Sequence, residues 1–282
     1  MSDALRIASG RFGRVALLDM DKPLVRHAHP HCHVLLKVEG ADTQFSVKDS
    51  LVPLTDESAV LINSWEPHAY EHNCMMPKTI ILALYVEPKW LSYFRPNWAA
   101  SNSPDFFEKN VGAITPHIHS LTRTLAEAMM YEPENAKYHE TLLADLMIAV
   151  IERFTAWKDV QVSVRDIASL TSIDFRIRKA IRLMKEAPET IADLDGLASS
   201  VGLSRAHFYR LFESATGVSP RIYINVQRVE QAVMALSDGS VPLATVADRL
   251  GFSASSHFSR FFHDNVGSTP SSFRSASFLA SK

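Results

Sequence analysis

The sequence is poor in cysteine and lacks any long apolar segment. Cysteine occurs only at Cys32 and Cys74, which excludes a disulfide framework and favours a reducing compartment. The longest apolar runs, Ile80–Val86 and Leu146–Ile151, are far shorter than the roughly 20 residues of a membrane span. The N-terminal segment scatters arginines among small residues and contains no apolar signal core. We therefore expect a soluble, cytoplasmic protein without a membrane partner.

Neither sign of charge dominates the whole chain, but its two parts differ. The formal net charge of the 282 residues is −2. From Asp174 onward the chain has 13 basic and 10 acidic residues, whereas the part before it has 16 basic and 21 acidic ones. The length predicts about two domains. A mildly basic second domain is compatible with binding a polyanion, although a difference of this size also arises by chance.

The second part contains an internal repeat. The segment Gly251–Phe262 repeats the pattern of Gly202–Phe212. The offset between the two copies is 49 residues at the glycines and 50 residues from the histidines His207 and His257 onward. The echo continues downstream, where Gly217–Pro220 corresponds to Gly267–Pro270. So many matches of residue type and spacing indicate a true duplication.

Each copy of the repeat is predicted to form a helix-turn-helix. A short helix, over residues 193–200 in the first copy and 243–250 in the second, ends at Gly202 or Gly251, a residue suited to the left-handed conformation. Ser204 or Ser253 follows as a candidate N-cap of the next helix. Two helices joined by a tight turn containing glycine are typical of DNA-binding proteins. The alternative is a helical repeat that only packs on itself.

The second helix of each copy has one apolar and one polar face. Phe208, Leu211 and Phe212, and their counterparts in the second copy, lie at i, i+3 and i+4, the spacing of a buried stripe. The outward residues are predicted to contact DNA. In the first copy they are Arg205, Ala206, Tyr209 and Arg210, and in the second Ser255, Ser256, Ser259 and Arg260.

The segment between the two copies predicts their separation. Residues 219–236 have the apolar periodicity of one helix, with Pro220 in its first turn. Such a helix is about 27 Å long, close to the roughly 34 Å of one DNA turn. One chain is therefore predicted to occupy two successive major grooves of promoter DNA. Because the two copies are unequal, the site bound by one chain should be asymmetric.

From Asp174 to Arg274 the sequence resembles the DNA-binding domain of the AraC/XylS family of bacterial transcription regulators. The matching segments are Ile177–Ile181, Leu197–Ser204, Phe208–Phe212, Gly217–Pro220, Arg228–Ala232, Val246–Ser253, His257–Phe262 and Gly267–Arg274. The resemblance implies seven helices, promoter binding and activation through contact with RNA polymerase. It assigns DNA contacts to Ala206, Tyr209 and Arg210, and to Ser256, His257, Ser259 and Arg260.

The sequence departs from the family pattern in the first copy. Glu213 and Ser214 stand where the family often has basic residues, and Ala206 is too small to hydrogen-bond a base. We therefore expect the first copy to contact fewer bases and to depend on Tyr209 and Arg210.

Residues 1 to about 110 are predicted to be β-structure. Short runs rich in β-branched and aliphatic residues are separated by glycine and proline, and their near-regular spacing is typical of a small barrel or sandwich. The runs are Arg14–Leu18, Val34–Val38, Thr43–Val47, Ser58–Asn63 and Thr79–Val86. The segment 29–70 resembles the cupin barrel that often precedes this kind of DNA-binding domain.

Histidines at every second position are the most distinctive local feature of the first domain. They are His27, His29, His31 and His33, and His68 and His72 lie further along the chain. Imidazole is a frequent ligand of transition metals, but metal-binding cupins follow their His-x-His with a glutamate that this sequence lacks. We therefore favour a polar pocket for a small-molecule effector over a metal site. The residues predicted to form this pocket are His29, His31, His33, Trp65 and His68.

Residues 115–157 are predicted to form two apolar helices after the β-structure. Thr115 and Pro116 open the first, and a break at residues 132–134 precedes the second. These helices must pack on the barrel, on a partner chain or on both. In the family, helices at this place commonly form the dimer interface, so a homodimer is expected. Residues 158–173 are predicted to be a linker.

Together these features predict an α+β protein of two domains. Residues 1–157 form a cupin-like domain for effector binding and dimerisation, and residues 174–282 form an all-α DNA-binding domain. The expected function is that of a transcriptional activator that responds to a small molecule, without enzymatic activity or a cofactor. The alternatives are a metal-dependent cupin enzyme fused to a DNA-binding domain, and a dimeric regulator that needs no ligand.

Overall fold

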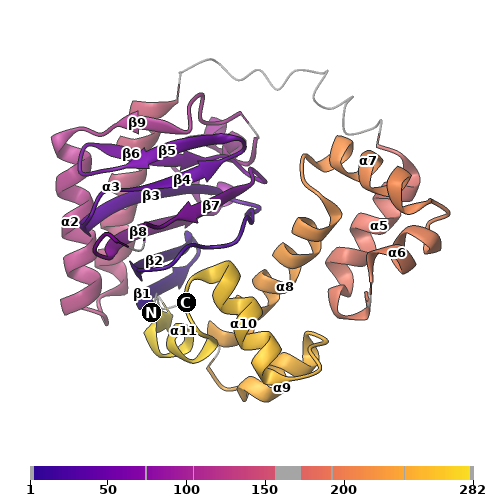
Figure 1. Ribbon diagram of the computed structural model, residues 1–282. Coiled ribbons are helices and arrows are strands. Elements are labelled where there is room, and N and C mark those ends of the chain that lie inside the picture. Colours follow the sequence, from indigo (N-terminus) through magenta and orange to yellow (C-terminus); the bar gives the residue numbers. More distant parts are fainter. Residues whose placement is uncertain are drawn as a thin grey trace.

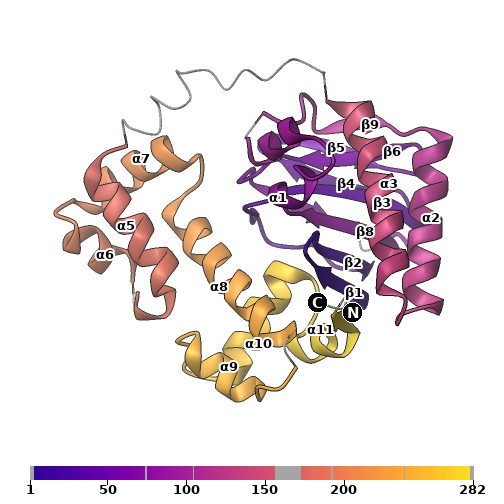
Figure 2. The ribbon, with the colours of Figure 1, turned by 180° about the vertical axis from the view of Figure 1, so that it is seen from behind.

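A computed structural model of the chain describes residues 3–73, 75–103, 105–155, 173–191, 193–237 and 239–279. Strands and helices of the first part form one domain, and the helices of the second part form another (Figures 1 and 2). The predicted linker 158–173 lies outside the described residues except for Ile173, and Cys74 lies outside them as well. Cys32 is fully buried in the core of the first domain. Within the described ranges, no helix combines the length and the hydropathy needed to cross a bilayer.

The strands form two sheets. The large sheet has the order β10-β1-β2-β8-β3-β6-β9 and the small sheet the order β5-β4-β7. The strands are β1 (Asp3–Gly10), β2 (Gly13–Met20), β3 (Cys32–Gly40), β4 (Thr43–Val47), β5 (Ser50–Leu54), β6 (Ser58–Ile62), β7 (His68–Glu71), β8 (Thr79–Val86), β9 (Val111–Ala113) and β10 (Ser277–Leu279).

The two faces of the large sheet have different partners. Because side chains alternate along a strand, β2 directs Val15 and Leu17 to one face and Ala16 and Leu18 to the other. The first face is covered by α2 (Pro116–Tyr131) and α3 (Ala136–Phe154), together with α1 (Pro88–Leu91) and the 3₁₀ helix η1 (Pro96–Asn102). The second face packs against the small sheet. The apolar stripes of α2 and α3 therefore pack on the first domain itself, one of the partners that their sequence allowed.

Seven α-helices are described in the second domain, as the resemblance implied. They are α5 (Phe175–Glu186), α6 (Leu194–Ser200), α7 (Arg205–Thr216), α8 (Pro220–Ser237), α9 (Leu243–Arg249), α10 (Ser255–Val266) and α11 (Pro270–Ala276), and the 3₁₀ helix η2 (Pro188–Thr190) follows α5. The turns that end α6 and α9 contain Gly202 at φ +74° and Gly251 at φ +76°, the left-handed backbone that glycine favours.

The N-caps of the second helices differ from the prediction in detail. Ser204 is the N-cap of α7, but its side chain makes no capping hydrogen bond. In the second copy the N-cap is Ala254 and not Ser253. The extra residue of this copy lengthens the turn by one position, which moves the serine away from the helix start.

The second helix-turn-helix unit is docked on the first domain. Residues of α8, α9, α10 and α11 share one apolar core with the inner face of the large sheet. β10 pairs in parallel with β1 at the sheet edge, and the Val25 N–H donates a hydrogen bond to the Asp264 carbonyl of α10 (N···O 3.2 Å). Figure 1 shows α10 and α11 beside β1, whereas α5, α6 and α7 lie at the other end of α8. The two units therefore meet the first domain very differently.

Two equivalent glycines provide a test of this docking. Gly217 and Gly267 are the left-handed C-caps of α7 and α10, at φ +75° and +82°. A Cβ on Gly217 would meet no atom of the described residues within 4 Å, but one on Gly267 would lie 3.2 Å from the Met20 Cε and 3.5 Å from the Leu24 Cδ2.

Replacement of either glycine by alanine costs about 1–2 kcal/mol in backbone strain, and only Gly267→Ala also disturbs the domain contact. We expect Gly267→Ala to lower the melting temperature of the full chain more than Gly217→Ala. Equal shifts, measured by differential scanning fluorimetry, would contradict the docking.

Candidate functional site

The first recognition helix, α7, is anchored by aromatic side chains. Phe208 and Phe212 are fully buried, with ring centroids 5.5 Å apart, and Phe212 meets Tyr223 of α8 edge to face at 5.3 Å. Burial of this face leaves Arg205, Ala206 and Arg210 exposed and Tyr209 half-buried. The predicted DNA contacts of the first copy therefore lie on the solvent side of the helix.

The second recognition helix, α10, repeats this arrangement. Phe258 and Phe262 are buried, and Phe262 meets Phe273 of α11 edge to face at 5.2 Å. Tyr223 and Phe273, which correspond in the sequence repeat, thus perform the same packing role. Ser255, Ser256, His257 and Arg260 are exposed on the opposite face, and Ser259 is half-buried.

The polar residues of the two recognition helices are not equally free. The Arg205 guanidinium binds Asp195 of α6 (N···O 2.8 Å), and the Ser259 hydroxyl donates to the Ser255 carbonyl of its own helix (2.8 Å). Arg210 and Arg260 form no ion pair with any other residue that the structure describes. These two guanidinium groups are therefore available to bind phosphates or base edges.

The far end of α10 is buried against the first domain. Asn265, Val266 and Ser268 are buried, and Asp264 accepts the hydrogen bond from Val25 described above. The helix is therefore exposed at its N-terminal half and held at its C-terminal end. Val25 belongs to the loop 21–31, which joins β2 to β3. A movement of this loop would move the recognition helix α10.

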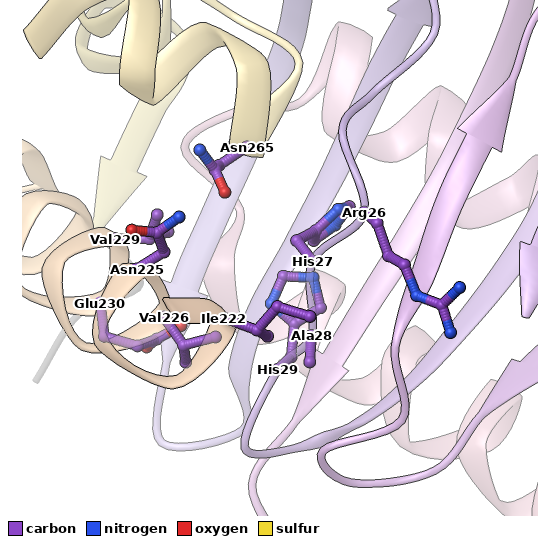
Figure 3. Close-up of a pocket in the computed structure, with 10 residues that line it drawn as sticks. All are labelled: Arg26, His27, Ala28, His29, Ile222, Asn225, Val226, Val229, Glu230 and Asn265. Carbon is purple, nitrogen blue, oxygen red and sulfur yellow. The ribbon is translucent and has the colours of Figure 1, made fainter. Parts of the chain in front are cut away.

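This loop also faces α8 across a small pocket. Arg26, His27, Ala28 and His29 line one side, and the other side is lined by Ile222, Asn225, Val226, Val229, Glu230 and Asn265 (Figure 3). Figure 3 shows the His27 and His29 rings close together on this loop, between the sheet and α8. The same loop residues therefore reach both the interior of the first domain and the helices of the second domain.

Four buried histidines gather at this place. His27, His29, His33 and His68 are each less than 8% exposed. Their neighbouring ring centroids lie 4.4 Å apart for His27 and His68, 4.9 Å for His27 and His29, and 5.2 Å for His29 and His68. The backbone brings the first pair together, because His27 and His68 exchange two N–H···O=C hydrogen bonds of 2.9 and 2.8 Å. The His33 ring stacks on Tyr85 at 4.1 Å.

Burial determines the protonation of this histidine cluster. It lowers the pKa of His33 to about 3 and the pKa values of His29 and His68 well below 6.5, and neighbouring imidazoles lower the latter two further. Burial also lowers the pKa of His27. The four rings are therefore neutral at pH 7, and their nitrogen lone pairs are available as acceptors or ligands.

The structure brings together only some of the predicted effector residues. His29, His33 and His68 belong to the histidine cluster, but the His31 Nε2 lies outside it, 2.9 Å from the Glu87 carboxylate. Trp65 lies on the side facing the second domain, where its ring stacks on Tyr223 of α8 at 4.6 Å and an interplanar angle of 4°. Proline at position 30 interrupts the strand alternation on which the prediction depended, and β3 begins only at Cys32.

Three residues of this region were not predicted from the sequence. The histidine run could have indicated His27, but Arg14 and Tyr85 carry no local signal. They are paired across β2 and β8, and the Arg14 guanidinium lies 4.0 Å from the centre of the Tyr85 ring. Both residues line a cleft of about 430 Å³ between the domains.

This interdomain cleft has a mixed lining. The first domain contributes Ser9, Gly10, Gly13, Arg14, His31, Tyr85 and Glu87, and α8 contributes Glu230, Val233, Met234 and Ser237. Its volume lies within the range of pockets for small molecules. Met234 is 66% exposed, and together with Val233 it gives the α8 side an apolar surface.

Comparisons with known proteins agree with the arrangement of the second domain. Residues 197–276 match the family described as a helix-turn-helix domain. The probable transcriptional regulator LumQ of Photobacterium leiognathi is 21% identical over 256 residues, which are 90% of this chain and 94% of LumQ. The arabinose operon regulatory protein of Escherichia coli is 28% identical over 195 residues, 66% of this chain and 63% of that protein.

The fold of the whole chain also has a solved counterpart. The crystal structure of ToxT from Vibrio cholerae with a bound unsaturated fatty acid has a TM-score of 0.51 and 12% sequence identity. The likeness covers 92% of this chain and 94% of ToxT, so the arrangement of a sheet-rich domain before a helical domain is shared.

The stack of Trp65 on Tyr223 gives a testable prediction about the interdomain contact. An aromatic pair contributes about 0.5–1.5 kcal/mol beyond its buried area, and this pair joins the two domains. We expect Trp65→Ala to speed amide hydrogen exchange in α8 and in the loop 26–29 by roughly 2- to 12-fold. The matched control is Tyr93→Ala, which removes a ring that is 71% exposed. Unchanged exchange in Trp65→Ala would show that the stack does not hold the domains together.

Proposed function

We propose that the chain is a transcription regulator of the AraC/XylS type, and that it binds an asymmetric promoter site through both recognition helices, α7 and α10. The observation that carries this proposal is the matched pair of aromatic anchors, which exposes the same face of each copy of the repeat. Arg210 and Arg260 are exposed on these faces and form no ion pair with a residue that the structure describes, unlike Arg205, which binds Asp195.

The length of α8 supports binding to two successive grooves. Its 18 residues span about 27 Å, and α7 and α10 lie at its opposite ends (Figures 1 and 2). Major grooves on one side of DNA recur at about 34 Å. Arg210 would read bases in one groove and Arg260 in the next, with Tyr209, Ser256 and His257 beside them.

We infer that the effector binds against the sheet domain in the interdomain cleft. The cleft has room for a small molecule and has walls from both domains. His31 is the residue of the predicted effector set that lines the cleft. A ligand there contacts Arg14 on one domain and Met234 on the other, so it favours the docked arrangement over any other.

The lining of the cleft favours an organic acid with an apolar body. Arg14 is a buried cation, only 8% exposed, and a carboxylate would complement it. Val233 and Met234 would contact the apolar part. ToxT, which shares the fold, has been solved with an unsaturated fatty acid, a molecule of this class.

Three further properties are proposed from the family resemblance. The chain would form a homodimer in the cytoplasm, contact RNA polymerase and activate transcription. The apolar stripes of α2 and α3 pack against the large sheet of the first domain. A dimer would therefore form through the outer surface of these helices, where Tyr131 is 82% and Tyr138 38% exposed.

Substitution of the two free arginines tests DNA binding. Each base contact by arginine is worth about 1–3 kcal/mol, which corresponds to roughly 5- to 150-fold in affinity. We expect Arg210→Ala and Arg260→Ala each to weaken binding by this factor. Binding is measured by gel shift on a sequence selected by the full chain from random DNA. The control is Arg123→Ala, an exposed arginine on α2; equal affinity of all variants would refute the assigned interface.

The effector proposal is tested with an unsaturated fatty acid below its micellar concentration. Ligand binding to the folded chain raises the melting temperature, and we expect Arg14→Gln to abolish the increase seen with the parent protein. Arg123→Gln should retain it. An equal increase in Arg14→Gln would show that the acid binds elsewhere, and no increase in any variant would exclude this ligand class.

A further inference from the structure

We propose that His27, His29 and His68 form a binding site for a divalent transition-metal ion. Each of the three side chains offers a ligand nitrogen, and these nitrogens all lie within 4.8 Å of one another. Nitrogens bound to one zinc ion at about 2.0–2.1 Å lie about 3.4 Å apart in tetrahedral geometry. The ligand nitrogens therefore need to approach one another by up to about 1.4 Å to share an ion.

Hydrogen bonds to the backbone orient the imidazoles for this role. The Nδ1 of His27 lies 2.7 Å from the Val25 carbonyl, and the Nδ1 of His68 lies 2.8 Å from the Glu66 carbonyl. A carbonyl oxygen only accepts, so each Nδ1 carries the proton and each Nε2 carries a lone pair. Metal-binding histidines are typically held in this way by a hydrogen bond on the second nitrogen.

The unmet hydrogen-bonding capacity of the cluster points to a ligand. The Nε2 atoms of His29 and His68 are buried and have no hydrogen-bond partner among the residues that the structure describes, and the two residues are only 4% and 1% exposed. An unpaired polar atom in such a place is unfavourable, because it has lost its hydrogen bonds to water. A cation that accepts both lone pairs removes this cost.

The donor set selects the class of ion. Neutral imidazole suits Zn²⁺, Cu²⁺, Ni²⁺ and Fe²⁺, whereas Mg²⁺ and Ca²⁺ require oxygen ligands. His33 adjoins the three ligands, with its ring centre 5.2 Å from that of His29, and its Nδ1 is bound to the Leu84 carbonyl at 3.1 Å. His33 is therefore the histidine next to the three ligands that could occupy a fourth position.

Metal binding would fix the loop that holds the second recognition helix. His27 and His29 belong to the loop whose Val25 N–H binds Asp264 of α10, whereas His68 belongs to β7 of the small sheet. An ion shared by these residues ties the loop to the sheet domain. Metal binding itself does not depend on whether the chain binds DNA.

The experiment measures binding of Zn²⁺ and Co²⁺ to the full chain after removal of metal by a chelator. We expect about one equivalent of either ion, and the intense visible absorption bands of Co²⁺ in a low-coordinate nitrogen site. His29→Gln and His68→Gln should each weaken Zn²⁺ binding by more than the roughly 10- to 100-fold that loss of an outer hydrogen-bond partner costs.

The matched control is His31→Gln. His31 belongs to the same run of histidines but lies beside Glu87 and outside the cluster, so this variant should bind Zn²⁺ like the parent. Equal loss of affinity in His31→Gln and His68→Gln would show that the run acts as an unstructured chelator, which overturns the proposal. If His29→Gln and His68→Gln fail to fold, the comparison of Zn²⁺ affinity between the parent and His31→Gln still tests the proposal, because the proposal requires the two affinities to be equal. A weak spectrum typical of Co²⁺ coordinated by six water molecules, or the absence of stoichiometric binding, refutes the site.

Discussion

Aromatic packing under the two recognition helices is the constraint on which the rest of the structure depends. A helix that buries two phenylalanines one turn apart must expose its opposite face, and this occurs twice, in α7 and α10. In each copy an aromatic residue of the following helix, Tyr223 or Phe273, meets the second phenylalanine edge to face. The duplicated sequence therefore produces duplicated surfaces, and α8 sets the distance between them.

The two copies of the repeat differ in how they meet the first domain. The second copy shares a continuous apolar core with the large sheet, and the C-terminal end of α10 is bound to the loop at Val25. The first copy meets the sheet domain through Trp65 and Ala28. A molecule in the interdomain cleft, or an ion at the histidine cluster, would act on the same loop and the same side of α8. Both would change the position of one recognition helix relative to the other.

Sequence patterns predicted the local features well and the long-range ones poorly. The helices of the second domain follow from periodicity and glycine stops, and β4 and β8 have the predicted bounds. The strand β1 was not predicted, because its residues lack the β-branched run that marks a strand and depend on pairing with β2. The histidine run indicated a site, but Pro30 breaks its alternation, so His27 joined the cluster in place of His31. The contact between Trp65 and Tyr223 joins residues far apart in the chain, and no local pattern could predict it.

The most direct test of the central claim is a hydroxyl-radical footprint of the full chain on a DNA sequence that it selects. Two exposed faces held at the ends of α8 predict two unequal protected segments for each chain, about one helical turn apart on the same side of the DNA. Protection near one segment should be lost with Arg210→Ala and near the other with Arg260→Ala. A single protected segment, or loss of the same segment in both variants, would contradict the account.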